Sequence, residues 1–180
     1  MIISVNEAKE LINFDDTWND AKIERKLKAI EQVIRSYTNN NFQARAYRRT
    51  ADIIGSLFVA DALIPFEVGD TVQVSESGLN KGLYTIKAVE DSTFEVNESV
   101  KEESDVLVTK IVYPDDVIDC CINLLEWENT NRKKVGIKSE TLSRHSVTYF
   151  DMDSNNQIMG YPASLLGCLK AYKKARCWLW

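Results

Sequence analysis

The spacing of apolar residues changes twice along the 180-residue chain, and no other feature restricts the possible folds as much. Near both ends the apolar residues recur every three or four positions, as the buried face of an α-helix requires. Between Ala44 and Val112 they alternate with polar residues in short runs bounded by turn-forming residues. Such runs are typical of a small antiparallel barrel or sandwich. We therefore predict an α+β fold, in which an SH3-like antiparallel β-barrel is inserted into a small helical bundle.

The charged residues follow the same division. The predicted helical body, which also carries a hairpin, comprises residues 1–50 and 111–180, and the predicted barrel comprises residues 51–110. Residues 51–112 hold four lysines against twelve acidic residues, so the whole negative excess of this −5 chain lies in its middle part. Charge asymmetry of this kind is typical of modules with separate partners. On charge alone, a well-solvated acidic surface is the favoured interpretation.

Two helices are expected before the barrel. Ser4 and Glu7 match a capping box, in which each side chain accepts a hydrogen bond from the other residue's backbone N–H. The first helix should end near Asn13. Candidate caps for the second helix are Asp15, Asp16 and Thr17. This helix should stop at Asn39–Asn41, because asparagine tolerates the left-handed backbone of a helix end.

Two further helices are expected after the barrel. Pro114 at the first helical position, followed by acidic residues, favours a helix start. Its buried face should consist of Val117, Cys120, Cys121, Leu124 and Leu125. Pro162 should open the last helix in the same way. Its inward residues should be Leu165, Leu166, Leu169 and Tyr172.

The strands expected in the barrel are short and closely spaced. They are Thr71–Ser75, Leu83–Val89, Thr93–Val96 and Asp105–Val112. Tyr84 and Phe94 lie at alternating apolar positions and should belong to the core. After the third helix, Gly136–Leu142 and Ser146–Phe150 predict a β-hairpin. Its polar tip holds the candidate contact residues Lys138, Glu140, Arg144 and His145, and a solvated tip without a role is as good an interpretation.

No set of residues in the sequence is typical of catalysis or of metal binding. The single histidine, His145, lies in the polar tip, and Asp151–Asn155 lacks the glycine and the later glutamate of a calcium loop. The four cysteines lack zinc-ligand spacing and should be reduced, buried thiols. We therefore expect a protein that is not an enzyme and that uses no cofactor or metal.

We also expect no membrane segment. No apolar run approaches the roughly 20 residues that cross a bilayer. The first residues lack the basic and apolar regions of a signal peptide, so an intracellular protein is expected.

The end of the chain combines basic and aromatic residues without acidic ones. The candidates for a docking surface are Lys170, Lys173, Lys174, Arg176, Trp178 and Trp180. Tryptophan, tyrosine and arginine dominate the energetic hot spots of interfaces. A tryptophan that covers the protein's own core is an equally good interpretation.

In this layout the chain resembles the head–tail connector, or head-completion adaptor, family of long-tailed bacteriophages and prophages. The segments that carry the resemblance are Ser4–Lys9, Tyr37–Phe42, Tyr113–Val117, Val135–Leu142, Ser146–Tyr149 and Tyr161–Leu166. None of these segments is a catalytic signature. Many members of the family lack the inserted barrel.

The resemblance implies a structural subunit at the head–tail junction of the virion, assembled in the host cytoplasm. It would form a homo-oligomeric, dodecameric ring below the portal protein, extend the DNA channel and carry a stopper or tail-completion protein. DNA would pass without sequence-specific binding. The resemblance also implies that the region after the hairpin, including the basic C-terminal residues, approaches the portal.

Two other classes compete with this interpretation. One is a monomeric SH3-like module that recognises a peptide or a nucleic acid. The other is a minor phage enzyme or nuclease, which the missing set of metal-binding carboxylates disfavours. The mass of the particle in solution separates a ring from a module.

Overall fold

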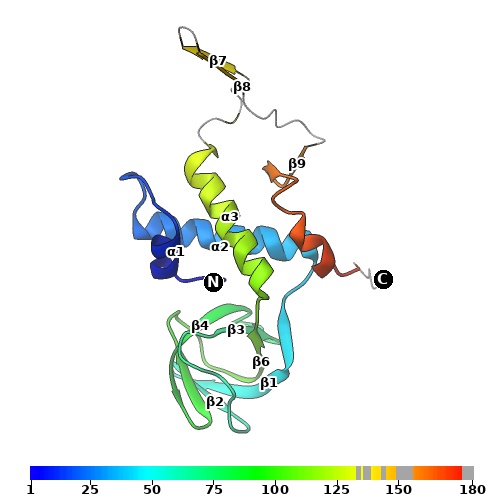
Figure 1. Cartoon of the computed structure of the whole chain (residues 1–180). Helices are drawn as coiled ribbons and strands as arrows, with labels where there is room; N and C mark the ends of the chain where they lie inside the picture. Colours follow the sequence, from blue (N-terminus) through cyan, green and yellow to red (C-terminus); the bar gives the residue numbers. More distant parts are fainter. Residues whose placement is uncertain (133–134, 136–138, 143–144, 149–155, 176–180) are drawn as a thin grey trace. The chain divides into compact units, whose positions relative to one another are not determined.

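The computed structural model describes residues 1–132, 135, 139–142, 145–148 and 156–175. The chain forms two compact units, which are coloured along the sequence in Figure 1. The first unit comprises Met1–Asn40 and Pro114–Trp180, and the second comprises Asn41–Tyr113. The fold is thus mixed α+β, and one unit is inserted in the sequence of the other.

The first unit begins with two helices. In α1 (Val5–Leu11) the predicted capping box is present: the Glu7 N–H donates to Ser4 Oγ at 3.2 Å and the Ser4 N–H donates to Glu7 Oε2 at 2.7 Å. Helix α2 (Asp20–Thr38) ends at Asn39, whose φ of 49° is left-handed, as expected. Its predicted cap was wrong, because Asn19 caps it, whereas Asp15 accepts the Thr17 N–H in a turn before it.

Helix α3 (Asp115–Thr130) crosses α2 (Figure 1). Pro114 is the residue before the helix rather than its first residue, because its backbone is extended, with ψ of 153°. The predicted buried face is confirmed, and it comprises Val117, Cys120, Cys121, Leu124 and Leu125. Burial raises the pKa of Cys121 to about 12 and also raises the pKa of Cys120, so both thiols stay protonated at neutral pH.

The predicted helix from Pro162 is wrong. Pro162 instead belongs to β10 (Tyr161–Pro162), which pairs with β9 (Gln157–Ile158) across the turn at Gly160, whose φ is 84°. In the described residues that follow, up to Ala175, the one helical element is a short 3₁₀ helix, η2 (Cys168–Tyr172). Leu166 and Leu169 are buried, as predicted. Their burial determines the conformation of this segment more strongly than helical propensity does.

Two further strands follow α3 in the sequence. They are β7 (Ser139–Leu142) and β8 (His145–Thr148), which pair antiparallel with Leu142 opposite His145. The tip residues Ser143 and Arg144 lie outside the described residues, as does the segment Asp151–Asn155 that was compared with a calcium loop.

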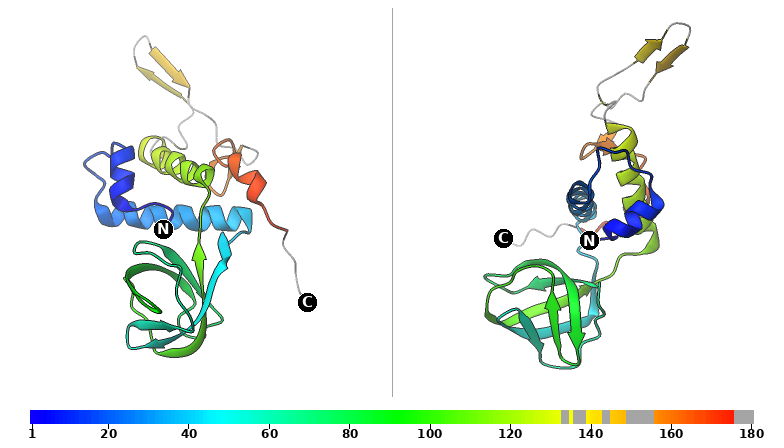
Figure 2. Two further views of the ribbon diagram at one scale, coloured as in Figure 1. Left: turned by 60° about the horizontal axis from the view of Figure 1, so that its bottom comes forward. Right: turned by 90° about the vertical axis from the view of Figure 1, so that its left-hand side faces the viewer.

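The second unit is a closed antiparallel barrel with the strand order β1-β2-β5-β4-β3-β6, which Figure 2 shows from two sides. Its strands are β1 (Gln43–Ile54), β2 (Leu57–Ala60), β3 (Thr71–Ser75), β4 (Gly82–Glu90), β5 (Thr93–Val96) and β6 (Glu103–Ile111). The rings of Phe58 and Phe94 stack at 4.6 Å in its core, and Phe66 packs edge-on against Phe94 at 5.6 Å. Tyr84 is partly buried against the same core. The last four strands match those predicted.

The predicted barrel boundary of 51–110 was too short. Strand β1 begins at Gln43 and pairs with β6 from Ile111 to Glu103, so the unit starts at Asn41. Arg45, Arg48 and Arg49 obscured this strand, because they interrupt the alternation of apolar and polar residues. With them, the barrel holds seven basic and twelve acidic residues, and it is less acidic than predicted.

The two ends of the barrel segment meet at a neck. The Val112 N–H donates to the Phe42 carbonyl at 3.0 Å, and the rings of Phe42 and Tyr113 lie 5.0 Å apart. A chain that enters and leaves at one point can be bridged by a short connection at little entropic cost.

We predict that the first unit folds without the barrel. Replacing residues 43–111 by a short Gly/Ser linker should leave cooperative unfolding, because each unit has its own buried core. All four tryptophans lie outside the barrel, so tryptophan fluorescence in urea follows the first unit alone. Replacing only 66–110 should cause aggregation, since it leaves Phe58 of β2 without the core that buries it. A gradual, non-cooperative transition in the 43–111 deletion would contradict this division.

The Glu103 carboxylate fastens the loop between β3 and β4 to β6. It accepts hydrogen bonds from the Ser77 hydroxyl at 2.6 Å, the Gly78 N–H at 2.6 Å, the Asn80 side-chain amide at 2.8 Å and the Leu79 N–H at 3.3 Å. These hydrogen bonds, with that from Ser77 the strongest, lower the pKa of Glu103 from 4.5 to about 2. The loop is therefore held by the charged form of one side chain.

We predict an acid-dependent loss of barrel stability. Because folding lowers the pKa of Glu103, its contribution is complete above pH 4.5 and is lost as the pH falls towards 2. Glu103→Gln should destabilise the barrel at pH 7 and weaken its pH dependence between 5 and 2. Urea titrations followed by the methyl NMR signals of Val74 and Val108 measure this. Glu90→Gln, an exposed change in the same barrel, is the control, and an equal pH dependence in both variants would contradict the prediction.

Candidate partner-docking surface on the first unit

The described part of the C-terminal region, residues 156–175, is called the terminal segment here. It is anchored on α3 by Glu128, whose side chain is 2% exposed. Glu128 Oε1 accepts the Tyr161 hydroxyl at 2.9 Å, and Oε2 lies 2.8 Å from the Lys26 ammonium of α2. Burial and the neighbouring Glu128 carboxylate raise the pKa of Tyr161, so its hydroxyl stays a donor. One buried carboxylate thus joins α2, α3 and the terminal segment.

Arg132 extends this anchor at the surface. Its Nη1 donates to the Gly160 carbonyl at 2.8 Å, which holds the turn between β9 and β10. Its guanidinium lies 5.4 Å from the Trp127 ring centre and 5.8 Å from that of Tyr161, and the two rings pack edge-on at 5.5 Å. Arginine over aromatic faces adds a cation–π attraction to the hydrogen bonds.

The other end of the terminal segment lies against the C-terminus of α2. The Lys174 N–H donates to the Thr38 carbonyl at 2.8 Å, and the Asn39 side-chain amide donates to the Ala175 carbonyl at 3.0 Å. The Asn40 amide donates to the Tyr172 carbonyl at 3.3 Å. The terminal segment therefore satisfies a backbone carbonyl that the end of a helix leaves without an intrahelical partner.

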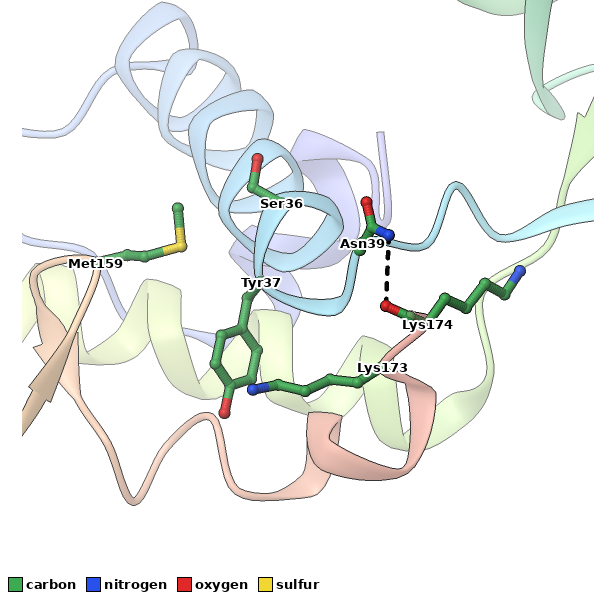
Figure 3. Close-up of a pocket in the computed structure, with 6 residues that line it drawn as sticks. All are labelled: Ser36, Tyr37, Asn39, Met159, Lys173 and Lys174. Carbon is green, nitrogen blue, oxygen red and sulfur yellow. Dashed lines mark hydrogen bonds between the residues drawn. The ribbon is translucent and has the colours of Figure 1, made fainter. Parts of the chain in front are cut away.

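A shallow pocket of ≈ 510 Å³ lies where α2 and the terminal segment meet (Figure 3). It is lined by Ser36, Tyr37, Asn39, Met159, Lys173 and Lys174. The Lys173 ammonium lies 3.8 Å from the centre of the Tyr37 ring, whereas the Lys174 side chain points away from that ring (Figure 3). A cation beside an aromatic ring and an exposed methionine can bind an acidic side chain with an apolar neighbour.

The predicted docking residues fall into two groups. Lys170, Lys173 and Lys174 are exposed on the terminal segment. Arg176, Trp178 and Trp180 lie outside the described residues.

Of the predicted hairpin residues, Glu140 lies in β7 opposite Val147 and His145 lies in β8 opposite Leu142. Lys138 and Arg144 lie outside the described residues.

Sequence reasoning missed Tyr37, Asn39 and Met159 as members of this surface. Tyr37 reads as one more residue of a buried helical face, and Met159 precedes the predicted last helix in a stretch to which no element was assigned. The run of three asparagines at the end of α2 was a usable signal, because amide side chains can cap a second segment as well as end a helix.

In the part of the chain that the structure describes, no three histidine, cysteine, aspartate or glutamate side chains are grouped to hold a metal ion. The same residues include no helix long and apolar enough to span a membrane. No model of a known protein family matches the chain, and a search of curated proteins finds no match either.

We predict that Glu128 carries much of the stability of the first unit. Tyr161→Phe removes a hydrogen bond to a charged acceptor and should lower the free energy of unfolding by about 1.5–3 kcal/mol. Glu128→Ala leaves the Tyr161 hydroxyl and the Lys26 ammonium without their acceptor and should cost about 3–5 kcal/mol. Urea unfolding followed by tryptophan fluorescence measures both.

Lys28→Ala is the matched control, because it breaks an exposed ion pair with Glu24 of 2.7 Å, and it should cost under about 1 kcal/mol. If Tyr161→Phe behaves like this control, the buried carboxylate does not anchor the terminal segment.

Proposed function

We propose that the protein is a structural, non-enzymatic head–tail connector subunit, which forms a ring below the portal protein and joins the phage head to a stopper or tail-completion protein. The observation that carries this proposal is the placement of the segments resembling that family. The described parts of all of them belong to the first unit, apart from the residues at the neck, whereas the barrel is a separate unit. A connector body with an inserted module accounts for this division.

The proposal assigns portal docking to the terminal segment and the residues after it. Lys170, Lys173 and Lys174 supply exposed positive charge, which speeds encounter with an acidic partner. The pocket beside Tyr37 offers a place for an acidic side chain of that partner. Trp178 and Trp180 would act as the apolar anchors.

The acidic charge of the barrel is consistent with a channel protein that does not bind the DNA passing through it. Its twelve acidic residues exceed its seven basic ones, and phosphate contacts dominate non-specific affinity for DNA. An SH3-like character of the barrel and a bundle arrangement of the helices belong to the same proposal. The β7–β8 pair, with Glu140 and His145, is assigned to contacts with neighbouring subunits or with the channel.

We predict that removal of the last residues separates folding from docking. A chain ending at Arg176 should keep the melting temperature of the full chain, because it retains the whole terminal segment, including the hydrogen bond from Asn39 to Ala175. It should bind the portal protein of the same genome at least about tenfold more weakly, as the loss of an interface hot spot implies. Surface plasmon resonance with immobilised portal measures the affinity.

Two controls accompany this experiment. Lys170→Glu should slow association at low salt, whereas Lys28→Glu, the same charge change on the exposed side of α2, should not. Leu166→Asp should unfold the unit, because it places a charge at a fully buried position. If the shortened chain binds the portal protein with unchanged affinity, then Trp178 and Trp180 cover the protein's own core in the full chain and do not contact the portal.

A further inference from the structure

The pairing of β1 with β6 is interrupted near the start of β1. Gln43 pairs with Ile111 and Arg48 pairs with Thr109, so Ala44–Tyr47 stand opposite Lys110 alone. A bulge of this kind redirects side chains away from the regular alternation of a strand. Arg45 is exposed here, and the Tyr47 side chain keeps 44% of its surface exposed.

Positive charge is concentrated at this end of the strand pair, which is called the basic end. Four of the seven basic residues of the barrel lie here: Arg45, Arg48, Arg49 and Lys110. The Lys110 ammonium lies 2.6 Å from Asp70 and 6.0 Å from the centre of the Tyr47 ring. Tyr47 is thus an exposed aromatic residue near one cation, whereas Arg48 donates to the Thr109 hydroxyl and Arg49 to the Leu63 carbonyl.

The opposite end of the same strand pair, called the acidic end, has the reverse charge. Asp52, Glu102 and Asp105 are exposed there, and one base, Lys101, precedes them. Asp52 accepts the Asp105 N–H at 2.9 Å and Glu102 accepts the Gly55 N–H at 3.1 Å, so backbone contacts hold two of these carboxylates in place. Ile54 lies in the same stretch and is 62% exposed.

The two ends are too far apart to neutralise each other within one chain. Seven steps along the strand separate the exposed Arg45 from Asp52, which is up to roughly 23 Å at 3.3 Å per residue. The Debye length at physiological salt is about 8 Å. Each end therefore presents its own charge, beside its own exposed apolar side chain, to another molecule.

We propose that the β1–β6 strand pair is a self-association surface, in which the basic end of one copy contacts the acidic end of a second copy. Such a contact uses two different faces and repeats head to tail, which is the geometry that closes a ring. Tyr47 would pack against Ile54 of the next copy, with Arg45 facing Glu102. The inference rests on the proposed function for the ring, but the contact itself is testable without a portal protein.

Charge complementarity favours a second copy over DNA as the occupant. A nucleic acid bound at the basic end would face a barrel with twelve acidic residues. The acidic end of another copy offers opposite charge and an apolar residue of its own. The contact between opposite charges would offset part of the repulsion between two net-acidic barrels.

The test reverses one charge at each end of the full chain. Sedimentation velocity at low ionic strength should show wild-type mass rising above 20.5 kDa with concentration, and less so in 0.5 M salt. Arg45→Glu and Glu102→Lys should each weaken association by about tenfold. An equimolar mixture of the two variants should recover it, because the two reversed ends match each other. Lys87→Glu, on β4 and far from β1 in the strand order, is the control with the same charge change as Arg45→Glu.

A wild-type chain that stays at 20.5 kDa up to high concentration, or variants that all associate like the wild type, would overturn the inference. The inference would also be overturned if the mixture fails to restore association although both variants melt like the wild type. Binding of duplex DNA through Arg45 without self-association would overturn it as well. Portal affinity measured at dilutions where the chain is monomeric tests the proposed function separately.

Discussion

The first unit depends on a buried carboxylate. Glu128 would be destabilising if it were left alone inside the protein, because an unpaired charge in a non-aqueous environment is costly. Lys26 of α2 and Tyr161 of the terminal segment satisfy it, so the buried charge is stable only where α2, α3 and the terminal segment pack together. The terminal segment is thereby ordered by polar contacts as well as by the burial of Leu166 and Leu169. This anchor also fixes the position of the exposed Lys170, Lys173 and Lys174 on the terminal segment.

The barrel is stabilised by different means and so can be a separate module. Stacked phenylalanines lie in its core, and its strands form a closed barrel. The charged carboxylate of Glu103 holds the loop between β3 and β4 through several hydrogen bonds. Closure removes the free strand edges along which proteins aggregate. The longest interruption of the pairing between β1 and β6 is the bulge at Ala44–Tyr47. An inserted module of this kind can acquire contacts of its own without disturbing the helices.

The sequence predicted those elements whose local signals agree with their tertiary environment. The capping box at Ser4, the buried face of α3 and strands β3 to β6 follow from spacing and turn residues alone. The predictions failed where tertiary contacts override local preference. Pro162 looked like a helix start, but the anchoring of Tyr161 on Glu128 draws it into a strand. Charged residues hid β1, because Arg45 lies in the bulge and Arg48 and Arg49 interrupt the alternation just after it. Of the docking surface, the lysines were predicted, whereas the pocket beside Tyr37 needed the fold to bring its residues together.

The central claim is that this chain is a ring-forming subunit that assembles on a portal. Negative-stain imaging of the portal protein mixed with an excess of the chain tests it most directly. The account predicts an additional ring, coaxial with the portal, whose mass is a multiple of 20.5 kDa. A bare portal beside a chain that sediments as a 20.5 kDa monomer would contradict it and would favour a monomeric binding module.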